Sequence, residues 1–260
     1  MAKQQQVIVS LTSFPAAIPF AVQAVQSILR GSVLPDKIVL YLTATQFPQG
    51  QIPLELQDLS NRNSVFEVRF YEENIRSYTK LIPALKDFPD DIIITIDDDM
   101  WYAKYMLQRL LCLHKRYPKA IIGHRVRHLK LNAPYQMSKR YMNLRFLTKS
   151  MKPKFGNLQT GIGGVLYPPD SLKKEMLDSK LFMEMAPTTD DIWFWAAAVA
   201  NGTKIAPVRF GFWNPRELNK PTEISLKQVN IHSNRDVNRE VIESVIEKYP
   251  IIKQRIENEG

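Results

Sequence analysis

The aliphatic stretch IIITI at residues 92–96 constrains the fold more than any other part of the sequence. It is apolar at nearly every position, so both faces of the strand that it would form need to be buried, as in parallel sheets covered by helices. Strand-like runs at 7–14, 37–43 and 65–71 precede it, and residues 18–32 carry apolar side chains at helical spacing. This alternation predicts an α/β chain with a mostly parallel central sheet flanked by helices.

The rest of the chain predicts more elements of the same kind. With 260 residues, 45% of them hydrophobic, the chain is long enough to bury an extensive core in one domain. We expect this domain to cover residues 1–235. We expect residues 236–260 to form a C-terminal amphipathic helical segment. Within the domain we expect a helix at 103–117, a strand at 120–131, a glycine-rich turn into a strand at 161–169, and a helix capped by Thr188 or Thr189.

Charge is unevenly distributed along the sequence. The chain carries 35 Lys and Arg against 26 Asp and Glu, yet residues 100–169 contain 14 basic residues and no acid. Outside this segment the balance is 21 basic against 26 acidic residues, so the whole positive excess comes from it. A region of one sign attracts phosphates or an anionic membrane, although a solvated basic surface would have the same composition.

Three adjacent acids, Asp97, Asp98 and Asp99, follow the aliphatic stretch. In open α/β sheets, ligands bind beyond the carboxyl ends of the strands, which is where these acids are expected. One acid would suffice to cap a following helix, whereas three repel one another unless a cation lies between them. Carboxylates at the end of a rigid strand are the ligands that Mg²⁺ or Mn²⁺ prefers, so we expect a divalent ion here.

Four stretches in this order resemble one family of enzymes. They are VIVSLTSFP, SYTKLIPAL, IDDDM, and GIGGVLYPP together with TTDDIWFW. The set resembles the nucleotide-sugar glycosyltransferases of the GT-A fold, particularly the family 2-like inverting enzymes of bacterial surface polysaccharide and lipopolysaccharide synthesis. The resemblance covers roughly residues 7–235 and implies a Rossmann-like single domain, with a nucleotide-binding half at 7–100 and an acceptor-binding half at 101–235.

The resemblance also implies roles for individual residues. On the donor side it implies contacts from Thr12, Ser13, Phe14, Lys80, Asp97 and Asp98, with Lys80 facing either the diphosphate or a metal-side acid. As metal ligands it implies Asp99, Asp97 and His232, and as acceptor-side residues Gly163, Gly164 and Trp193. For the chemistry it implies Asp191 as general base and Asp190 as a ligand of the acceptor hydroxyl, although the two could be exchanged.

Each of these residues also has a purely structural interpretation that the sequence leaves open. Lys80 could be a surface lysine, and Asp190 and Asp191 could simply stabilise the first turn of a helix. Trp193 could be a core residue, the glycine pair a plain turn, and His232 a loop histidine with its hydrogen bonds satisfied.

Two other functional classes compete with a glycosyltransferase. A haloacid-dehalogenase-like, Mg²⁺-dependent phosphohydrolase also places acids after an apolar strand and has a lysine and a later acidic pair, which TTDDIW could imitate. Its first acids, however, normally follow the first strand of the chain. A non-enzymatic binder of anionic surfaces or nucleic acid would use residues 104–154, where aromatic residues alternate with basic ones. That second class leaves both acidic clusters unexplained.

The expected partners are a UDP-sugar donor, a saccharide or lipid-linked saccharide acceptor, and an anionic membrane in peripheral contact. We expect no nucleic acid as a partner. No stretch reaches the roughly 18 consecutive apolar residues of a membrane span, and the first residues lack a secretory pattern. The single cysteine, Cys112, excludes an internal disulfide. We therefore expect a cytoplasmic protein that can touch the inner face of the membrane.

Overall fold

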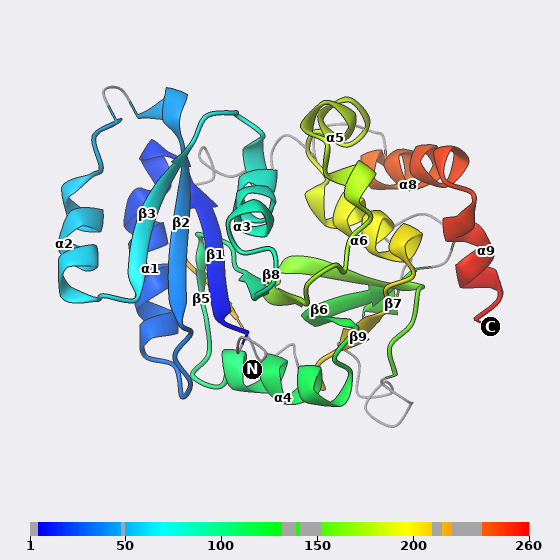
Figure 1. Ribbon diagram of the computed structural model, residues 1–260, viewed down its shortest axis with the longest axis horizontal. Helices are drawn as coiled ribbons and strands as arrows, with labels where there is room; N and C mark the ends of the chain where they lie inside the picture. The colour runs from blue at the N-terminus through cyan, green and yellow to red at the C-terminus, as the bar shows by residue number, and fades with distance from the viewer. Residues whose placement is uncertain are drawn as a thin grey trace.

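The computed structural model describes residues 5–47, 50–129, 131, 139–140, 152–209, 215–219 and 236–259. Its centre is an eight-stranded sheet with the order β3-β2-β1-β4-β8-β6-β7, in which β9 pairs with β6 (Figure 1). The strands of this sheet are β1 (Val7–Ser13), β2 (Lys37–Thr43), β3 (Phe66–Tyr71), β4 (Ile92–Thr95), β6 (Ile121–His128), β7 (Lys139–Arg140), β8 (Asn157–Tyr167) and β9 (Ile205–Pro207).

The first four strands confirm the expected parallel α/β arrangement. β1 lies parallel to β2 and to β4, and β2 lies parallel to β3, whereas β8 runs antiparallel to β4 and β6. The aliphatic stretch forms β4 with all four residues buried, Ile93 on one face of the sheet and Ile94 on the other. Because β1 and β4 are parallel neighbours, the residues that follow Ser13 and Thr95 lie at the same edge of the sheet.

Helices cover both faces of the sheet, as the doubly apolar strand requires. Residues of α1, α2 and α4 belong to the apolar core on one face, and residues of α3, α5 and α6 belong to the core on the other. These helices are α1 (Ile18–Leu29), α2 (Leu54–Arg62), α3 (Ile82–Asp87), α4 (Met106–Arg116), α5 (Ser179–Met185) and α6 (Asp190–Asn201). Short 3₁₀ helices are η1 (Pro15–Ala17), η2 (Ala44–Gln46), η4 (Arg76–Lys80) and η7 (Lys174–Leu177).

The C-terminal segment forms two helices, α8 (Val237–Lys248) and α9 (Ile251–Glu257), that lie beside α6 at one end of the molecule (Figure 1). They are separated at Tyr249 and Pro250, where the sequence suggests a break. Val245 and Ile252 are fully buried in the same core as α6. The segment therefore packs against the rest of its own chain.

The glycine-rich stretch at 161–169 differs from the expected turn, because residues 161–164 lie inside the long strand β8. Two of its glycines lie where a side chain would collide with a neighbouring strand or strain the backbone. A Cβ on Gly163 would lie 2.8 Å from the Arg125 backbone nitrogen of β6, and Gly164 has φ +83 and packs against Met106 of α4. These glycines therefore permit close packing within the sheet rather than a change of chain direction.

A second, two-stranded sheet pairs β5 (Met100–Trp101) with β10 (Arg216–Glu217) in antiparallel fashion. It holds a late segment of the chain against the residues that immediately follow the three acids. Among the described residues, no helix is long and apolar enough to cross a bilayer.

Candidate functional site

The three acids occupy the carboxyl edge of the sheet, and local hydrogen bonds fix their backbone and side chains. The Ser13 hydroxyl at the end of β1 donates to Asp98 Oδ2 at 2.6 Å. The Asp97 backbone N–H donates to the Tyr102 hydroxyl at 2.8 Å, and the Asp99 carbonyl accepts from the Leu218 N–H at 2.9 Å. Three separate parts of the chain therefore hold this acidic turn.

Lys80 is the residue that faces Asp97. It is the last residue of η4 and is 7% exposed, so its interpretation as a surface lysine is wrong. Its ammonium lies 2.9 Å from Asp97 Oδ1 and 3.0 Å from Asp190 Oδ2. One buried cation thus pairs with an acid after β4 and with an acid at the start of α6.

The second acidic cluster opens α6. Thr189 is the N-cap residue, as expected, but its side chain makes no capping hydrogen bond. Asp190 Oδ1 accepts from the Ser77 hydroxyl at 2.9 Å, and Asp191 Oδ1 accepts from the Gly161 N–H of β8 at 2.8 Å. The structure therefore gathers this pair and the acids after β4 around Lys80.

Gly161 lies where these groups converge. A Cβ built on Gly161 would lie 2.8 Å from Lys80 Nζ, 3.1 Å from Asp97 Oδ1 and 3.2 Å from Asp191 Oδ1. Glycine lets β8 pass this close to the three charged groups, because any side chain here would force Lys80 or the two carboxylates to shift.

The surroundings shift the pKa values of Asp191 and Lys80 for different reasons. Burial, followed by the neighbouring Asp190 carboxylate, raises the pKa of Asp191 to about 7, although Lys80 and the Gly161 N–H act in the opposite direction. Burial alone would lower the pKa of Lys80, but the Asp190 and Asp97 carboxylates outweigh it and hold this pKa well above the ordinary value. At neutral pH the site therefore has a fixed cation and an acid, Asp191, that can accept a proton.

This shift of Asp191 predicts how the stability of the protein depends on pH. The pKa of Asp191 is higher in the folded state than in the unfolded state. At any pH between these two pKa values the native state therefore binds more protons than the unfolded state, and stability falls as pH rises from about 4 through about 7. We expect Asp191→Asn to unfold at a higher temperature than the parent protein at about pH 8, and to lose this advantage towards pH 4. Thermal unfolding at both pH values checks this, with the exposed Asp58→Asn as control; an equal shift at both pH values would contradict it.

The other residues expected to contact the donor lie at the same edge of the sheet. Thr12 and Phe14 are half-buried, at and just beyond the end of β1. The Thr12 hydroxyl donates to the Tyr41 carbonyl of β2 at 2.8 Å. Together with Ser13, they place polar and aromatic side chains next to Asp98.

The three residues expected on the acceptor side are directed into the fold. Gly163 and Gly164 face β6 and α4, as described above. Trp193 is 0% exposed and its indole N–H donates to the Met176 carbonyl at 2.7 Å, so its ring packs in the core and does not offer a face to a sugar. His232 lies outside the described residues.

The structure also brings to the site residues that could not be singled out from the sequence. Ser77, which binds Asp190, lies beside Arg76, a non-glycine residue at φ 55, and such backbone strain is concentrated at functional sites. Gly161 belongs to the same GIGG stretch as the glycines singled out above. No local signal distinguishes Gly161 from Gly163, because their roles differ only through the elements that pack against β8.

The arrangement of the carboxylates decides what kind of metal site they can form. Within the described part of the chain, no three His, Cys, Asp or Glu side chains are arranged to hold a metal ion. Asp97, one of the expected ligands, is instead paired with Lys80. Mg²⁺ and Mn²⁺ commonly take only one or two protein carboxylates and complete their shells with substrate phosphates and water, so the acidic turn fits an ion that arrives with a diphosphate.

Comparison with solved structures identifies the fold. A mannosyltransferase, PcManGT from Pyrobaculum calidifontis, in complex with GDP-Man and Mn²⁺, matches 99% of this chain and 75% of its own, with a TM-score of 0.56 and 10% identity. S. aureus TarS 1–349, alone and with UDP, matches 79% of this chain at TM-scores of 0.49 and 0.48 and identities of 11% and 10%.

The present chain spans 58% of the length of each TarS chain. No protein-family model matches the chain, and neither does any curated protein. The similarity to the mannosyltransferase confirms the expected GT-A-like, Rossmann-like architecture, with a mostly parallel central sheet between layers of helices.

Proposed function

We propose that this protein is a metal-dependent glycosyltransferase that moves a sugar from a nucleotide-sugar donor to a saccharide acceptor, with inversion at the anomeric carbon. One observation carries the proposal: Asp97 after β4 and the pair Asp190–Asp191 of α6 meet around Lys80 on a GT-A-like sheet. Donor-side and acceptor-side acids need to be adjacent in such an enzyme, because the transferred sugar passes between the two substrates.

Asp191 is the proposed general base. As the acceptor oxygen attacks the anomeric carbon, its proton passes to the Asp191 carboxylate, and the bond to the nucleoside diphosphate breaks with its electron pair leaving on the diphosphate. A base works best when its pKa lies near the working pH, and the pKa of Asp191 is about 7. Asp190, which Ser77 and Lys80 hold, is the proposed contact for the acceptor hydroxyl.

The nucleotide is proposed to bind along the carboxyl edge of the N-terminal strands. Thr12, Ser13 and Phe14 would contact the base and ribose, with Asp98 beside them. A UDP-sugar is the first donor to test, and GDP-mannose the second, because the mannosyltransferase of similar fold binds GDP-Man. As in the family 2-like enzymes that the sequence resembles, the proposed acceptor is a surface saccharide, free or lipid-linked.

The proposed metal ion is Mn²⁺ or Mg²⁺, and Asp99 is its proposed protein ligand. When bound, the ion would stabilise the charge that develops on the departing diphosphate. The similar mannosyltransferase is in complex with Mn²⁺, which supports the same class of ion here. Asp97 is less suited to this role, because its carboxylate is already paired with Lys80.

The phosphohydrolase alternative is less well supported. Such an enzyme also has a lysine and a later acidic pair beside its strand-end acids, so the ion pairs of Lys80 fit both classes. The position of the acids separates the classes, because they follow the fourth strand of the chain, not the first.

Calorimetry with UDP and GDP tests the proposal. We expect one of the two nucleotides to bind in the presence of Mn²⁺, and its affinity to fall by about tenfold or more when EDTA removes the metal. If neither nucleotide binds with Mn²⁺ present, the proposed function is wrong.

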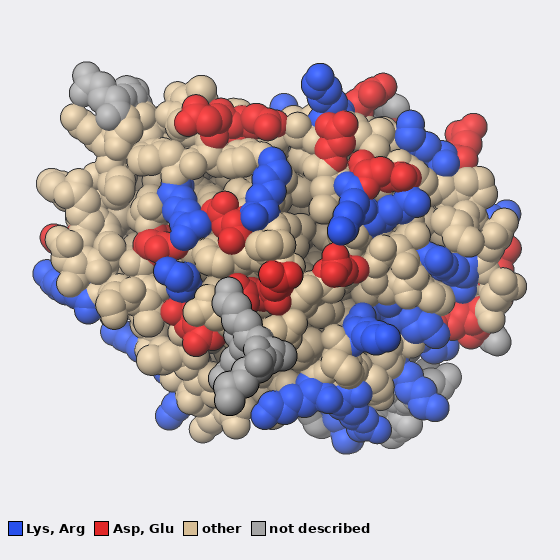
Figure 2. All heavy atoms as spheres, in the orientation of Figure 1, with Lys and Arg blue, Asp and Glu red and all other residues tan. Residues whose placement is uncertain are grey.

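A basic surface on α4 supports a proposed contact with an anionic membrane. Arg109, Lys115 and Arg116 are exposed on this helix, which contains no acid, and Lys104 and Lys119 flank it. Figure 2 shows basic side chains gathered along the lower edge of the molecule, where α4 lies in Figure 1. Such a surface is attracted to anionic lipids by about 1 kcal/mol per basic residue.

Sedimentation with vesicles checks this contact. We expect Lys115→Gln/Arg116→Gln to weaken binding to phosphatidylserine vesicles by about fivefold per charge removed, and binding to fade at high salt. The control is Lys173→Gln/Lys174→Gln, which removes the same charge elsewhere. If both variants bind equally well, or if only nucleic acid is bound, the membrane contact is wrong.

A further inference from the structure

The side chain of Lys80 is held by residues that lie far apart in the sequence. Its ammonium pairs with Asp97, 17 positions away, and with Asp190 at the start of α6. Its backbone carbonyl accepts from the Ser10 hydroxyl of β1 at 2.6 Å. Lys80 is thus fixed at both ends, by the sheet through its backbone and by two carboxylates through its side chain.

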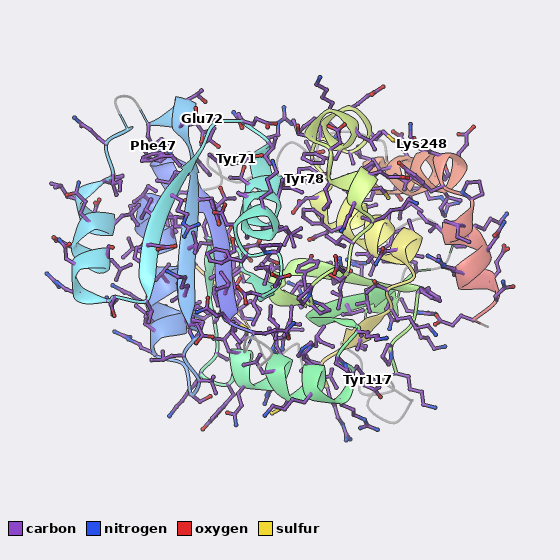
Figure 3. The ribbon with its side chains drawn as sticks, in the orientation of Figure 1. Phe47, Tyr71, Glu72, Tyr78, Tyr117 and Lys248 are labelled. Atoms are coloured by element: carbon purple, nitrogen blue, oxygen red, sulfur yellow. The ribbon has the colours of Figure 1, made fainter. Side chains whose placement is uncertain are left out.

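The segment that carries Lys80 is also attached to the region just before α6. The Tyr78 hydroxyl donates to the Ala186 carbonyl at 2.6 Å, and its ring stacks on Phe182 with 4.1 Å between centroids. Figure 3 labels Tyr78, which lies between α3 and the helices α5 and α6. Ser77 adds its bond to Asp190, so three of the five residues of η4 contact residues between Phe182 and Asp190.

The surroundings of the ammonium favour a fixed position over a mobile one. Lys80 is 7% exposed. The space beside its ammonium is so small that a Cβ on Gly161 would lie 2.8 Å from Nζ. A buried charge separated from its partners costs several kcal/mol. Turning Lys80 towards a diphosphate would break both ion pairs and leave the Asp97 and Asp190 carboxylates uncompensated.

We propose that Lys80 is a positioning residue that joins the donor side of the site to the acceptor side, holding Asp97 and Asp190 in place, and that it does not bind the donor diphosphate. The inference rests on the proposed function, whose acceptor contact Asp190 is one of the two carboxylates that Lys80 holds. Of the two contacts expected for Lys80, it excludes the diphosphate, keeps the acid after β4, and adds Asp190 as a second acid.

The variant Lys80→Met separates the two roles. We expect its affinity for the nucleoside diphosphate with Mn²⁺ to stay within about threefold of the parent protein, and its kcat for transfer to fall by about 100-fold. The control is Lys86→Met, an exposed lysine of α3 that bonds the Tyr71 hydroxyl, which should change neither value. If Lys80→Met weakens nucleotide binding by about tenfold or more, Lys80 is a diphosphate ligand and the inference is overturned.

A double-mutant cycle with Asp190→Asn tests the link itself. Groups that act as one unit are non-additive, so we expect the double variant Lys80→Met/Asp190→Asn to transfer no more than about threefold slower than the slower single variant. Losses that multiply would contradict the inference. The parent protein must first bind nucleotide and transfer sugar, so failure of the proposed function is seen before either variant is made.

Gly161→Ala provides a second route if Lys80→Met does not fold. The new methyl group would lie 2.8 Å from Lys80 Nζ, so the ammonium has to shift while its charge remains. We expect the same pattern, with nucleotide affinity retained and kcat lowered by about tenfold or more. Unchanged transfer in a folded Gly161→Ala would contradict the inference, because the position of the ammonium would then not matter.

Discussion

Replacing Asp191 by Asn is expected to lower kcat for sugar transfer by about 10²–10⁴-fold, the contribution typical of a general base. The amide can still accept the hydrogen bond from the Gly161 N–H, so the local structure should persist. It cannot take a proton from the acceptor hydroxyl. Affinity for the nucleoside diphosphate should stay unchanged, because Asp191 is proposed to contact the acceptor and not the donor.

Steady-state transfer assays give kcat and calorimetry gives the affinity for the nucleoside diphosphate, both on the same preparation. Asp170→Asn serves as control, because this acid is on the surface, with 81% of its side chain exposed. A transfer rate within about threefold of the parent protein would exclude Asp191 as the base. If Asp190→Asn instead shows the larger loss in kcat, the two acids of the pair exchange their roles.

Replacing Asp99 by Ala is expected to abolish the metal-dependent part of nucleotide binding. An ion that bridges a carboxylate and a diphosphate contributes several kcal/mol, so affinity with Mn²⁺ should fall by about 100-fold, towards its value in EDTA. Asp97→Ala is the matched comparison within the same motif. Because the Asp97 carboxylate is already paired with Lys80, its loss should weaken metal-dependent binding less than the loss of Asp99.

Electron paramagnetic resonance of Mn²⁺ with and without UDP or GDP follows the same variants directly. We expect tight Mn²⁺ binding only with nucleotide present, since the described side chains alone do not form a metal centre. Unchanged Mn²⁺ binding in Asp99→Ala, or a larger effect of Asp97→Ala, would show that the ligand assignment is wrong.

The parts of the fold that follow from local pattern could be predicted from the sequence. Residues 92–96 are apolar on both faces, and this alone places the strand in the interior with the acids at its carboxyl end. The start of α6 at Asp190 and the break of the C-terminal helices near Pro250 follow from residue preferences at helix ends.

The arrangement of the site depends on long-range contacts that no local pattern encodes. The pairing of Lys80 with Asp190 joins residues 110 positions apart, and nothing near Lys80 distinguishes it from a surface lysine. Trp193 belongs to a helix that is buried from Ile192 to Ala200, so periodicity could not tell which face a ring would occupy. The roles of Gly161 and Gly163 differ because β8 presents them to different neighbours.

Whether this protein is a glycosyltransferase is best tested by a screen of nucleotide-sugars for Mn²⁺-dependent turnover. We expect that one donor, with UDP-sugars and GDP-mannose tested first, releases its nucleoside diphosphate in the presence of Mn²⁺ and does so faster when a saccharide acceptor is added. Chelation of the metal should stop the release, and Asp191→Asn should remove the stimulation by acceptor. If no nucleotide-sugar is consumed under any of these conditions, the protein is not a glycosyltransferase.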